Sequence, residues 1–311
     1  MKDKDKIILA DLIDLHNSKA VFTEVKKIFC YHYPKTFFKE IEKCYKQVKS
    51  LFEGKFSDYN ACNTKYHDLM HTLDIFLAAA RLMDGYNLKE TKLSERLAIN
   101  LLKASLLHDT GYIQEKWDNE GTGAKHTMNH IGRSIAFVMK NRGDLAISKE
   151  DVDDIAKMIR CTEIKNRIST IPFSSEEEKT AGIIVGSADI LGQMSDREYL
   201  ERLLFLYNEM KEAGVPGYST EFDIIKSTLK LYKSVKGRLN NSFNKVYSYV
   251  ENHFSERFNI NKNLYIDAIE KNIAYIEKII NDSTTNFRQK LKRGNFVDTR
   301  THTDETRKDV Q

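Results

Sequence analysis

Residues 66–83 of this chain read YHDLMHTLDIFLAAARLM. Apolar side chains recur in this stretch at steps of three and four residues, at Leu69, Leu73, Phe76, Leu77 and Ala80. That spacing places them on one face of an α-helix and does not fit the two-residue alternation of a strand. The stretch therefore predicts a helix over residues 66–83 that packs one face against a core.

The composition of the whole chain extends this prediction. Only 14 of the 311 residues are glycine and 3 are proline, which is below the usual share of both residues. A chain so poor in turn-forming residues has few positions suited to the tight corners of a β-sandwich or barrel. Helical spacing recurs elsewhere, for example over residues 264–280, and no segment alternates convincingly like a strand. We therefore predict an all-α helical bundle.

Two further helices are predicted before and after the HisAspThrGly sequence of residues 108–111. Ser94 is suited to cap the start of the first helix, which we expect to end at this sequence. Gly111 is expected to adopt the left-handed conformation that often ends a helix. The second helix is predicted from about residue 124 to residue 139.

Charge and cysteine content point to a soluble chain without a polyanionic or membrane partner. The 49 basic and 45 acidic residues give a net charge of +4, so nothing demands nucleic acid as a partner. The longest apolar run, residues 75–80, is far shorter than the roughly 20 residues that span a bilayer. The four cysteines are scattered and the N-terminus lacks the apolar core of a signal peptide. We expect a cytoplasmic protein with reduced thiols, and the long amphipathic C-terminal helices are compatible with a homodimer.

Histidines are concentrated in one part of the chain. Five of the nine lie within 64 residues, at His67, His71, His108, His126 and His130. The first pair is four residues apart, which predicts that both side chains lie on one helical face, and the last pair repeats this spacing. Asp74 lies three residues after His71 and would share that face, either orienting a histidine or as a solvated charge.

Two aspartates complete the pattern. Asp109 follows His108 directly, at a predicted helix end, where both side chains can reach one site. Asp189 lies in the apolar, small-residue stretch GIIVGSADI of residues 182–190, where a carboxylate is costly to bury unless it is paired or binds a metal. Mixed histidine and aspartate ligands suit divalent Zn, Mn, Fe, Co or Mg. Helical bundles build metal centres from such side chains on facing helices.

The motifs YHDLMH (66–71), LLHD (106–109) and SADI (187–190) together resemble the HD superfamily of metal-dependent phosphohydrolases. The opening motif resembles the catalytic domains of cyclic-nucleotide phosphodiesterases. The resemblance implies a helical bundle and a phosphodiesterase activity on a small, cyclic-nucleotide-type phosphoester, through a metal-activated hydroxide. It implies these metal ligands: His71, His108, Asp109 and Asp189. It also implies that His67 is the general acid and that Asp109 takes part in catalysis.

The resemblance extends to a second ion. His130, or else His126, would bind a second metal or a phosphate oxygen, so that two divalent ions are expected. Lys125 and Arg133 lie near the motifs and are the candidates for substrate binding, although a solvated surface charge is the favoured interpretation of each. Trp117, in the loop after HisAsp, could stack on a base, but packing beneath the loop is the favoured interpretation.

The resemblance also divides the chain into regions. We predict an N-terminal helical extension over residues 1–59 and an HD-type phosphohydrolase core over 60–212. A C-terminal helical region packed on that core is predicted over 213–295, and a disordered tail over 296–311.

Departures from the family pattern leave the substrate open. HisAsp is followed by ThrGlyTyr at residues 110–112, and a GlyTyrPro sequence is absent, which disfavours cyclic-di-GMP. Two alternatives to a hydrolase remain at this point. One is a non-catalytic HD module that binds a nucleotide or a partner, and the other is a di-iron HD oxygenase.

Overall fold

The computed structural model describes residues 7–282 and 286–293. Within these ranges the chain forms eleven α-helices and no β-strand, with a single isolated bridge between Tyr59 and Glu115. The all-α prediction is confirmed. The predicted tail, residues 296–311, lies outside the described residues.

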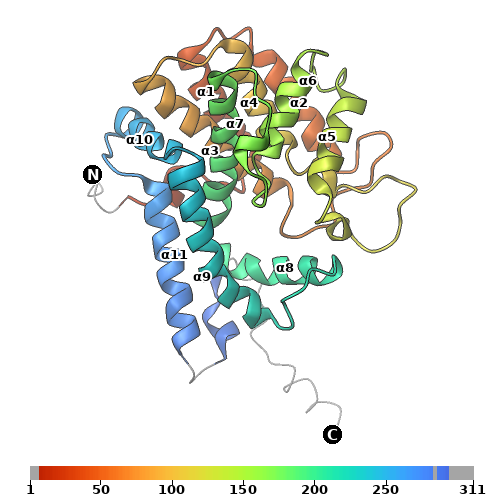
Figure 1. Ribbon diagram of the computed structural model, residues 1–311, viewed down its shortest axis with the longest axis vertical. Coiled ribbons are helices and arrows are strands. Elements are labelled where there is room, and N and C mark those ends of the chain that lie inside the picture. The colour runs from red at the N-terminus through yellow and green to blue at the C-terminus, as the bar shows by residue number, and fades with distance from the viewer. Residues whose placement is uncertain (1–6, 283–285, 294–311) are drawn as a thin grey trace, which may run out of the picture.

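The helices lie in chain order as follows: α1 (Ser18–His32), α2 (Phe38–Phe52), α3 (Leu69–Lys89), α4 (Glu95–Leu107), α5 (His130–Asn141), α6 (Asp151–Arg160), α7 (Glu176–Ser195), α8 (Tyr199–Glu212), α9 (Glu221–Gly237), α10 (Val250–Phe258) and α11 (Leu264–Asn281). In Figure 1, α1 to α7 gather in the upper part of the molecule, while α8, α9 and α11 extend below it.

Helix α3 is the centre of the bundle. It packs against α1, α4, α7 and α10, and every side chain from His71 to Gly85 is buried. The sequence predicted a helix with a single buried face. The structure instead buries it all round, which is why polar side chains on this helix need partners inside the protein.

Two predicted helix starts are wrong, and both errors concern histidines. Helix α3 begins only at Leu69, because the side chain of Asp68 accepts a hydrogen bond from the His71 backbone N–H at 2.9 Å and caps the helix. His67 therefore precedes the helix. Helix α5 begins at His130, and His126 lies in a preceding 3₁₀ turn. Neither histidine pair shares one helical face.

Gly111 also differs from its prediction. Helix α4 does begin directly after Ser94, and it ends at Leu107, but Gly111 is absent from the residues with a left-handed backbone. Instead, a Cβ atom at Gly111 would lie 2.0 Å from the carbonyl oxygen of His130 and 2.8 Å from the backbone nitrogen of Ser134. Glycine here lets the start of α5 press against the HisAsp loop.

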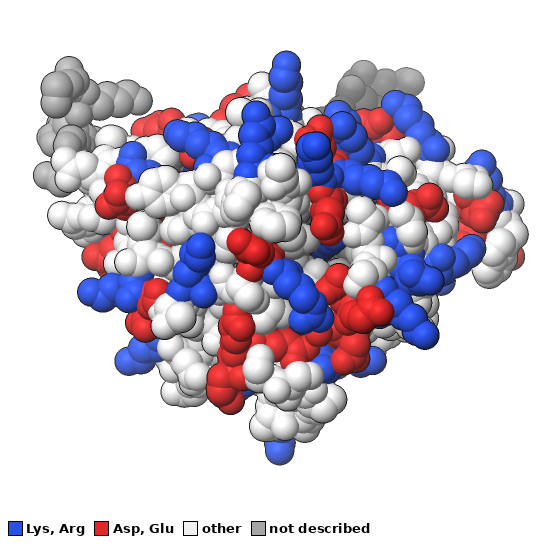
Figure 2. All heavy atoms as spheres, turned by 90° about the horizontal axis from the view of Figure 1, so that it is seen from above, with Lys and Arg blue, Asp and Glu red and all other residues white. Residues whose placement is uncertain are grey.

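The core runs through all the predicted regions. Buried apolar side chains between residues 21 and 291 form one cluster, so the N-terminal and C-terminal helices share a core with residues 60–212. On the face seen in Figure 2, basic and acidic side chains are interspersed. None of the helices in the described ranges has the length and apolar character needed to cross a membrane.

Candidate metal centre

Three helices bring the four predicted ligands together. His71 lies in the first turn of α3, His108 and Asp109 directly follow α4, and Asp189 lies on α7. Asp109 Oδ2 is 3.3 Å from His71 Nε2 and 3.1 Å from His108 Nε2. Asp189 Oδ1 is 3.8 Å and 3.9 Å from the same two nitrogens. We refer to these four residues as the candidate cluster.

These distances suit ligands around one ion. Ligand atoms about 2.1 Å from a metal at tetrahedral angles lie about 3.4 Å from one another. One ligand atom each from His71, His108 and Asp109 lies within 4.8 Å of the others, and all three residues are buried. The spacing is longer than a good charge-assisted hydrogen bond. The donor set therefore fits a divalent cation.

The orientation of His108 supports this fit. Its Nδ1–H donates to the Ser105 carbonyl at 2.9 Å, which leaves Nε2 with the lone pair that a metal ligand needs. Nε2 is buried and has no hydrogen-bond partner among the described residues, a costly state for a polar atom in a protein interior. The Ser134 hydroxyl fixes the same loop, since it donates to the His108 carbonyl at 2.6 Å and accepts from the Gly111 N–H at 2.9 Å.

The pKa values of the candidate cluster reflect the close approach of its imidazole and carboxylate groups in a buried site. Burial lowers the pKa of His108, but the Asp109 carboxylate outweighs burial and raises that pKa to about 9. Burial raises the pKa of Asp109, yet His108 and His71 hold it well below its usual range. Burial dominates at Asp189 and raises its pKa. A cation bound between these side chains would favour the deprotonated imidazole and carboxylate forms that ligate metals.

Asp189 has its own support. Gln193, one turn further along α7, donates to Asp189 Oδ1 at 3.2 Å. Tyr66 in turn donates to the Gln193 side-chain oxygen at 3.1 Å. Gly186 lets α7 approach its neighbours closely, because a Cβ there would lie 2.6 Å from the Cys161 carbonyl oxygen. The small residues around Asp189 therefore serve close packing.

His67 lies beside the cluster and is oriented by Glu209, a residue of α8 that the sequence pattern did not single out. His67 Nδ1 donates to Glu209 Oε2 at 2.6 Å, and the other Glu209 oxygen accepts the backbone N–H groups of Lys65 and Tyr66 at 2.8 and 2.7 Å. The His67 ring stacks on Tyr112 at a centroid distance of 4.1 Å. Burial lowers the pKa of His67, but Glu209 and nearby Asp109 outweigh it, so the pKa lies above its ordinary value.

Helix α8 fixes the histidine loop at a second point. Arg202 donates to the Tyr66 carbonyl at 2.7 Å and to Asp68 Oδ1 at 3.1 Å. Arg202 and Glu209 are seven residues apart, so they share a face of α8. Two charged residues seven positions apart on a largely buried helix are a sequence signal that could have revealed these contacts. No local motif, however, connects this pair of residues to His67.

The second histidine pair is split by the structure. His130 Nε2 lies 3.7 Å from Asp109 Oδ1, and its Nδ1–H donates to the Thr127 carbonyl at 2.7 Å, which leaves Nε2 available. His126 instead faces Asp118, with 3.3 Å between Nε2 and Oδ2. Only His130 of this pair therefore borders the candidate cluster.

The two basic residues assigned to substrate binding already have protein partners. Lys125 pairs with the Asp118 carboxylate and donates to the Glu120 carbonyl. Arg133 donates to the Gly111 carbonyl at 2.7 Å, and to the Ile113 carbonyl and the Glu115 carboxylate. Arg133 thus holds the loop that follows HisAsp in place, and its contact with substrate stays a prediction.

Two further expectations can be compared with the structure. Trp117 does not pack beneath its loop, because 79% of its surface is exposed. Asp74 is not a solvated charge, since it is 6% exposed. It lines a separate cavity together with residues 9–16 and 195–198. Asp74 Oδ1 has no hydrogen-bond partner among the described residues, so a role of Asp74 in orienting a histidine stays a prediction.

Comparison with known proteins identifies a family. A family model described as Npun_R2479-like matches residues 22–265. The match runs from α1 into the start of α11 and so includes the candidate cluster, His67, His130 and Glu209. Among curated proteins, none matches the chain.

Proposed function

This chain belongs to the Npun_R2479-like family, and we propose that it is a metal-dependent phosphohydrolase of the HD type. The observation that carries the proposal is the buried Nε2 of His108, which has no hydrogen-bond partner among the described residues and lies where His71, Asp109 and Asp189 converge. Two imidazoles and two carboxylates form a donor set suited to a divalent ion.

The ligands allow for two ions. Asp109 turns Oδ2 toward His71 and His108, and Oδ1 toward His130. A carboxylate with its oxygens directed to two groups of ligands suits a bridging position. Divalent ions held there would lower the pKa of a bound water toward about 7 and polarise the phosphoryl oxygens.

His67 is assigned the general acid. Glu209 accepts the Nδ1 proton of His67, so Nε2 is the atom from which a proton can pass to the leaving oxygen. The carboxylate fixes the ring and stabilises its protonated form, as in other carboxylate–histidine pairs. Stacking against Tyr112 restricts the ring further. Positioned acid catalysis of this kind contributes about 10²- to 10⁴-fold to the rate.

The expected substrate is a small nucleotide-type phosphoester, as the motif resemblance implies. Solvent reaches the site from the His130 side, since the exposed fraction of the side chain rises from 1% at His108 to 13% at Asp189 and 23% at His130. A phosphoester entering from that side would meet His130 and the outer oxygen of Asp109 first.

The test compares His71→Ala with His67→Ala on metal content and on rate. The purified chain is assayed on cyclic AMP, cyclic GMP, cyclic dinucleotides, dNTPs and guanosine tetraphosphate, each with Mn, Mg, Zn and Fe. His71→Ala should lose both metal and activity, while His67→Ala should keep the metal and lose about 10²- to 10⁴-fold in rate. His126→Ala is the matched control, because His126 faces Asp118 away from the cluster, and it should keep both.

The outcomes separate the candidate functions. Full activity in His67→Ala would refute the acid assignment. A metal-loaded chain that is inactive on the whole panel would favour a non-catalytic module. An absorption band of an oxo-bridged di-iron centre would favour the oxygenase.

A further inference from the structure

A separate cavity borders α3, and none of the four residues of the candidate cluster lines it. Its volume is about 860 Å³, within the range of cavities that hold small molecules. Residues 9–16 form one wall, residues 195–198 a second, and Lys292 and Arg293 border it near the end of the described chain. Asp74 and Arg81, both on α3, line its inner side.

Among the described residues, Asp74 has no hydrogen-bond donor for its inner oxygen. Its side chain is 6% exposed, and Oδ1 is fully buried without a hydrogen bond. Burial, together with the carboxylates of Asp196 and Asp68, holds the pKa of Asp74 well above its usual range. An unsatisfied acceptor is thus buried just behind the surface of the cavity that Asp74 lines, which is a costly state for a carboxyl group.

Arg81 is the second buried ionisable residue that lines the cavity, and its charge is opposite to that of an ionised Asp74. It is 2% exposed, and within the described ranges its guanidinium donates only to the Tyr265 hydroxyl, at 3.2 Å. Nε has no hydrogen-bond partner in that part of the chain, and the guanidinium lies over the rings of Phe254 and Tyr265. Arginine is always charged. A cation buried without a carboxylate within ion-pair distance is unusual in a protein interior.

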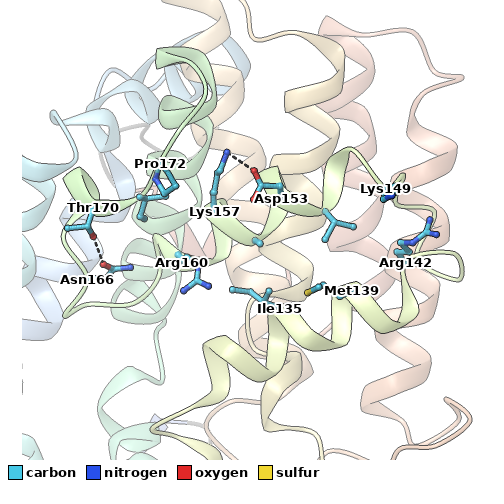
Figure 3. A pocket seen from close by; sticks show the side chains of 13 residues that line it. Ile135, Met139, Arg142, Lys149, Asp153, Lys157, Arg160, Asn166, Thr170 and Pro172 are labelled. Atoms are coloured by element: carbon cyan, nitrogen blue, oxygen red, sulfur yellow. Dashed lines mark hydrogen bonds and ion pairs between the residues drawn. The ribbon is translucent and has the colours of Figure 1, made fainter.

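The groove between α5 and α6 shows why burial matters here. Figure 3 shows Arg142, Lys149 and Arg160 around an apolar floor, with an ion pair between Lys157 and Asp153. Lys149 and Arg160 are exposed, and water solvates exposed cations without any ligand. Water has far less access to Arg81, so its missing counter-ion calls for a partner.

We propose that this cavity binds a small zwitterion of the ω-amino acid class, with its ammonium group at Asp74 and its carboxylate at Arg81. The ammonium group of such a ligand would favour the ionised form of the Asp74 carboxyl group, and its carboxylate would supply the anion that Arg81 lacks. This site is distinct from the candidate cluster and does not depend on the function proposed for it.

The placement of the two side chains sets the form of the ligand. Asp74 and Arg81 are seven residues apart, which is about 10 Å along the helix axis. Within the described ranges, the Arg81 guanidinium lies against Tyr265 and Phe254. The two groups do not come within ion-pair distance of each other in the described structure. These positions therefore favour a ligand whose charged ends are several methylene groups apart over an α-amino acid.

The cavity adjoins the elements that hold the candidate cluster. Met70, next to His71, and Gly192, three residues after Asp189, both line it. A ligand here would contact α3 and α7 within one helical turn of the metal ligands His71 and Asp189. Occupancy would therefore stabilise the packing of these two helices.

Calorimetric titration of the full chain tests the proposal with 4-aminobutanoate, 6-aminohexanoate and 8-aminooctanoate. At least one of them should bind, while hexanoate and hexylamine, which each carry a single pole, should bind at least about tenfold more weakly. Asp74→Asn keeps the shape of the side chain and should weaken the binding at least about tenfold, without lowering the thermal midpoint. Arg81→Gln should also weaken it, and Arg197→Gln at the exposed rim is the matched control that should leave it unchanged.

Three results would overturn the assignment. The first is that none of the three ω-amino acids binds below about 10 mM. The second is equal binding of hexanoate or hexylamine, which would mean that only one pole is recognised. The third is unchanged affinity in both Asp74→Asn and Arg81→Gln, which would place the ligand elsewhere.

Discussion

Asp109 and Asp84 are both buried aspartates that contact histidines, yet their surroundings differ in kind. Asp109 is 4% exposed, and the nearest imidazole nitrogens lie 3.1 to 3.7 Å from its oxygens. Asp84 is fully buried, and its Oδ1 and Oδ2 accept from His32 and His253 at 2.6 and 2.7 Å.

Arg257 completes the Asp84 group. It donates to both oxygens of the carboxylate, so all four lone-pair directions of Asp84 are used. Burial raises the pKa of Asp84, but the hydrogen bonds from His253, His32 and Arg257 outweigh it and hold that pKa well below its usual range.

The difference distinguishes a structural cluster from a candidate metal site. Asp84 is satisfied by protein donors at hydrogen-bond distance, and it joins α1, α3 and α10. Around Asp109 the nitrogens converge at distances that suit a shared ion better than a direct contact. Residue types alone do not separate the two groups, because both combine aspartate and histidine. Substitutions in each group test whether their roles are as different as their distances.

Among the charged groups of the two clusters, the largest effect on stability is expected from Asp84→Ala. Removing this carboxylate leaves Arg257 and two imidazoles without their acceptor, which should lower the free energy of unfolding by about 3–5 kcal/mol. Metal content per folded molecule should not change. Chemical denaturation and elemental analysis measure the two quantities. A loss below about 1 kcal/mol would contradict the structural role, since that is the range of exposed ion pairs.

The same cluster should make the fold sensitive to acid. Burial is the main cause that lowers the pKa of His253 to about 4, with Arg81 and Arg257 adding to it against the hydrogen bond to Asp84. Its Nε2 has no hydrogen-bond partner among the described residues, so a second proton would be unsolvated. The unfolded chain takes up this proton near pH 6.5, whereas the folded chain takes it up only near pH 4.

Stability should therefore fall as the pH drops from about 6.5 to 4, by about 3 kcal/mol from this residue. Above pH 6.5 the histidine should contribute no pH dependence. Urea denaturation at several pH values measures the slope. His253→Asn keeps a donor for Asp84 without a titrating ring, and its curve should be flatter. An equal slope in this variant would assign the acid sensitivity to other groups.

The two clusters also show what sequence reasoning could and could not find. The candidate cluster was accessible because His108 and Asp109 are adjacent and Asp189 interrupts an apolar helix. The Asp84 group has no such local signal, since His253 lies 169 positions away from Asp84. Glu209 was missed for the same reason, at 142 positions from His67.

The positions of helix boundaries were the second feature that the sequence did not predict correctly. The spacing of His67 and His71 suggested one helical face, but the Asp68 cap begins the helix between them. A capping residue competes with continuation of the helix, and periodicity alone does not reveal which prevails. The all-α fold was predictable because composition and helical spacing act over the whole chain.

Metal binding should stabilise one cluster only. At a free Mn concentration about 100 times its Kd, binding adds about 2.7 kcal/mol to the free energy of unfolding. The increment should be absent in His71→Ala and present in His126→Ala, where the altered side chain faces Asp118. Denaturation with and without Mn measures it. An equal increment in His71→Ala would place the ion outside the candidate cluster.

Gly111→Ala should act on the site through packing. The added Cβ would lie 2.0 Å from the His130 carbonyl oxygen, and backbone must move to admit it. We expect a loss of about 1–3 kcal/mol in the free energy of unfolding. His130 should also move away from Asp109, which would weaken the second ion more than the first. Gly132→Ala is the matched control, because a Cβ there meets nothing within 4 Å in the described structure.

The smallest effect is expected where neither cluster is involved. Trp117 is 79% exposed, so Trp117→Ala removes little buried area and should change the free energy of unfolding by no more than about 0.5 kcal/mol. Tyr112 lies five residues earlier, is 2% exposed and stacks on His67, so Tyr112→Ala should cost about 3–5 kcal/mol, as for other large buried aromatics. Denaturation of the two variants side by side tests whether the loop's stability depends on the ring beside the candidate cluster. A large loss in Trp117→Ala would mean that this side chain is covered in solution.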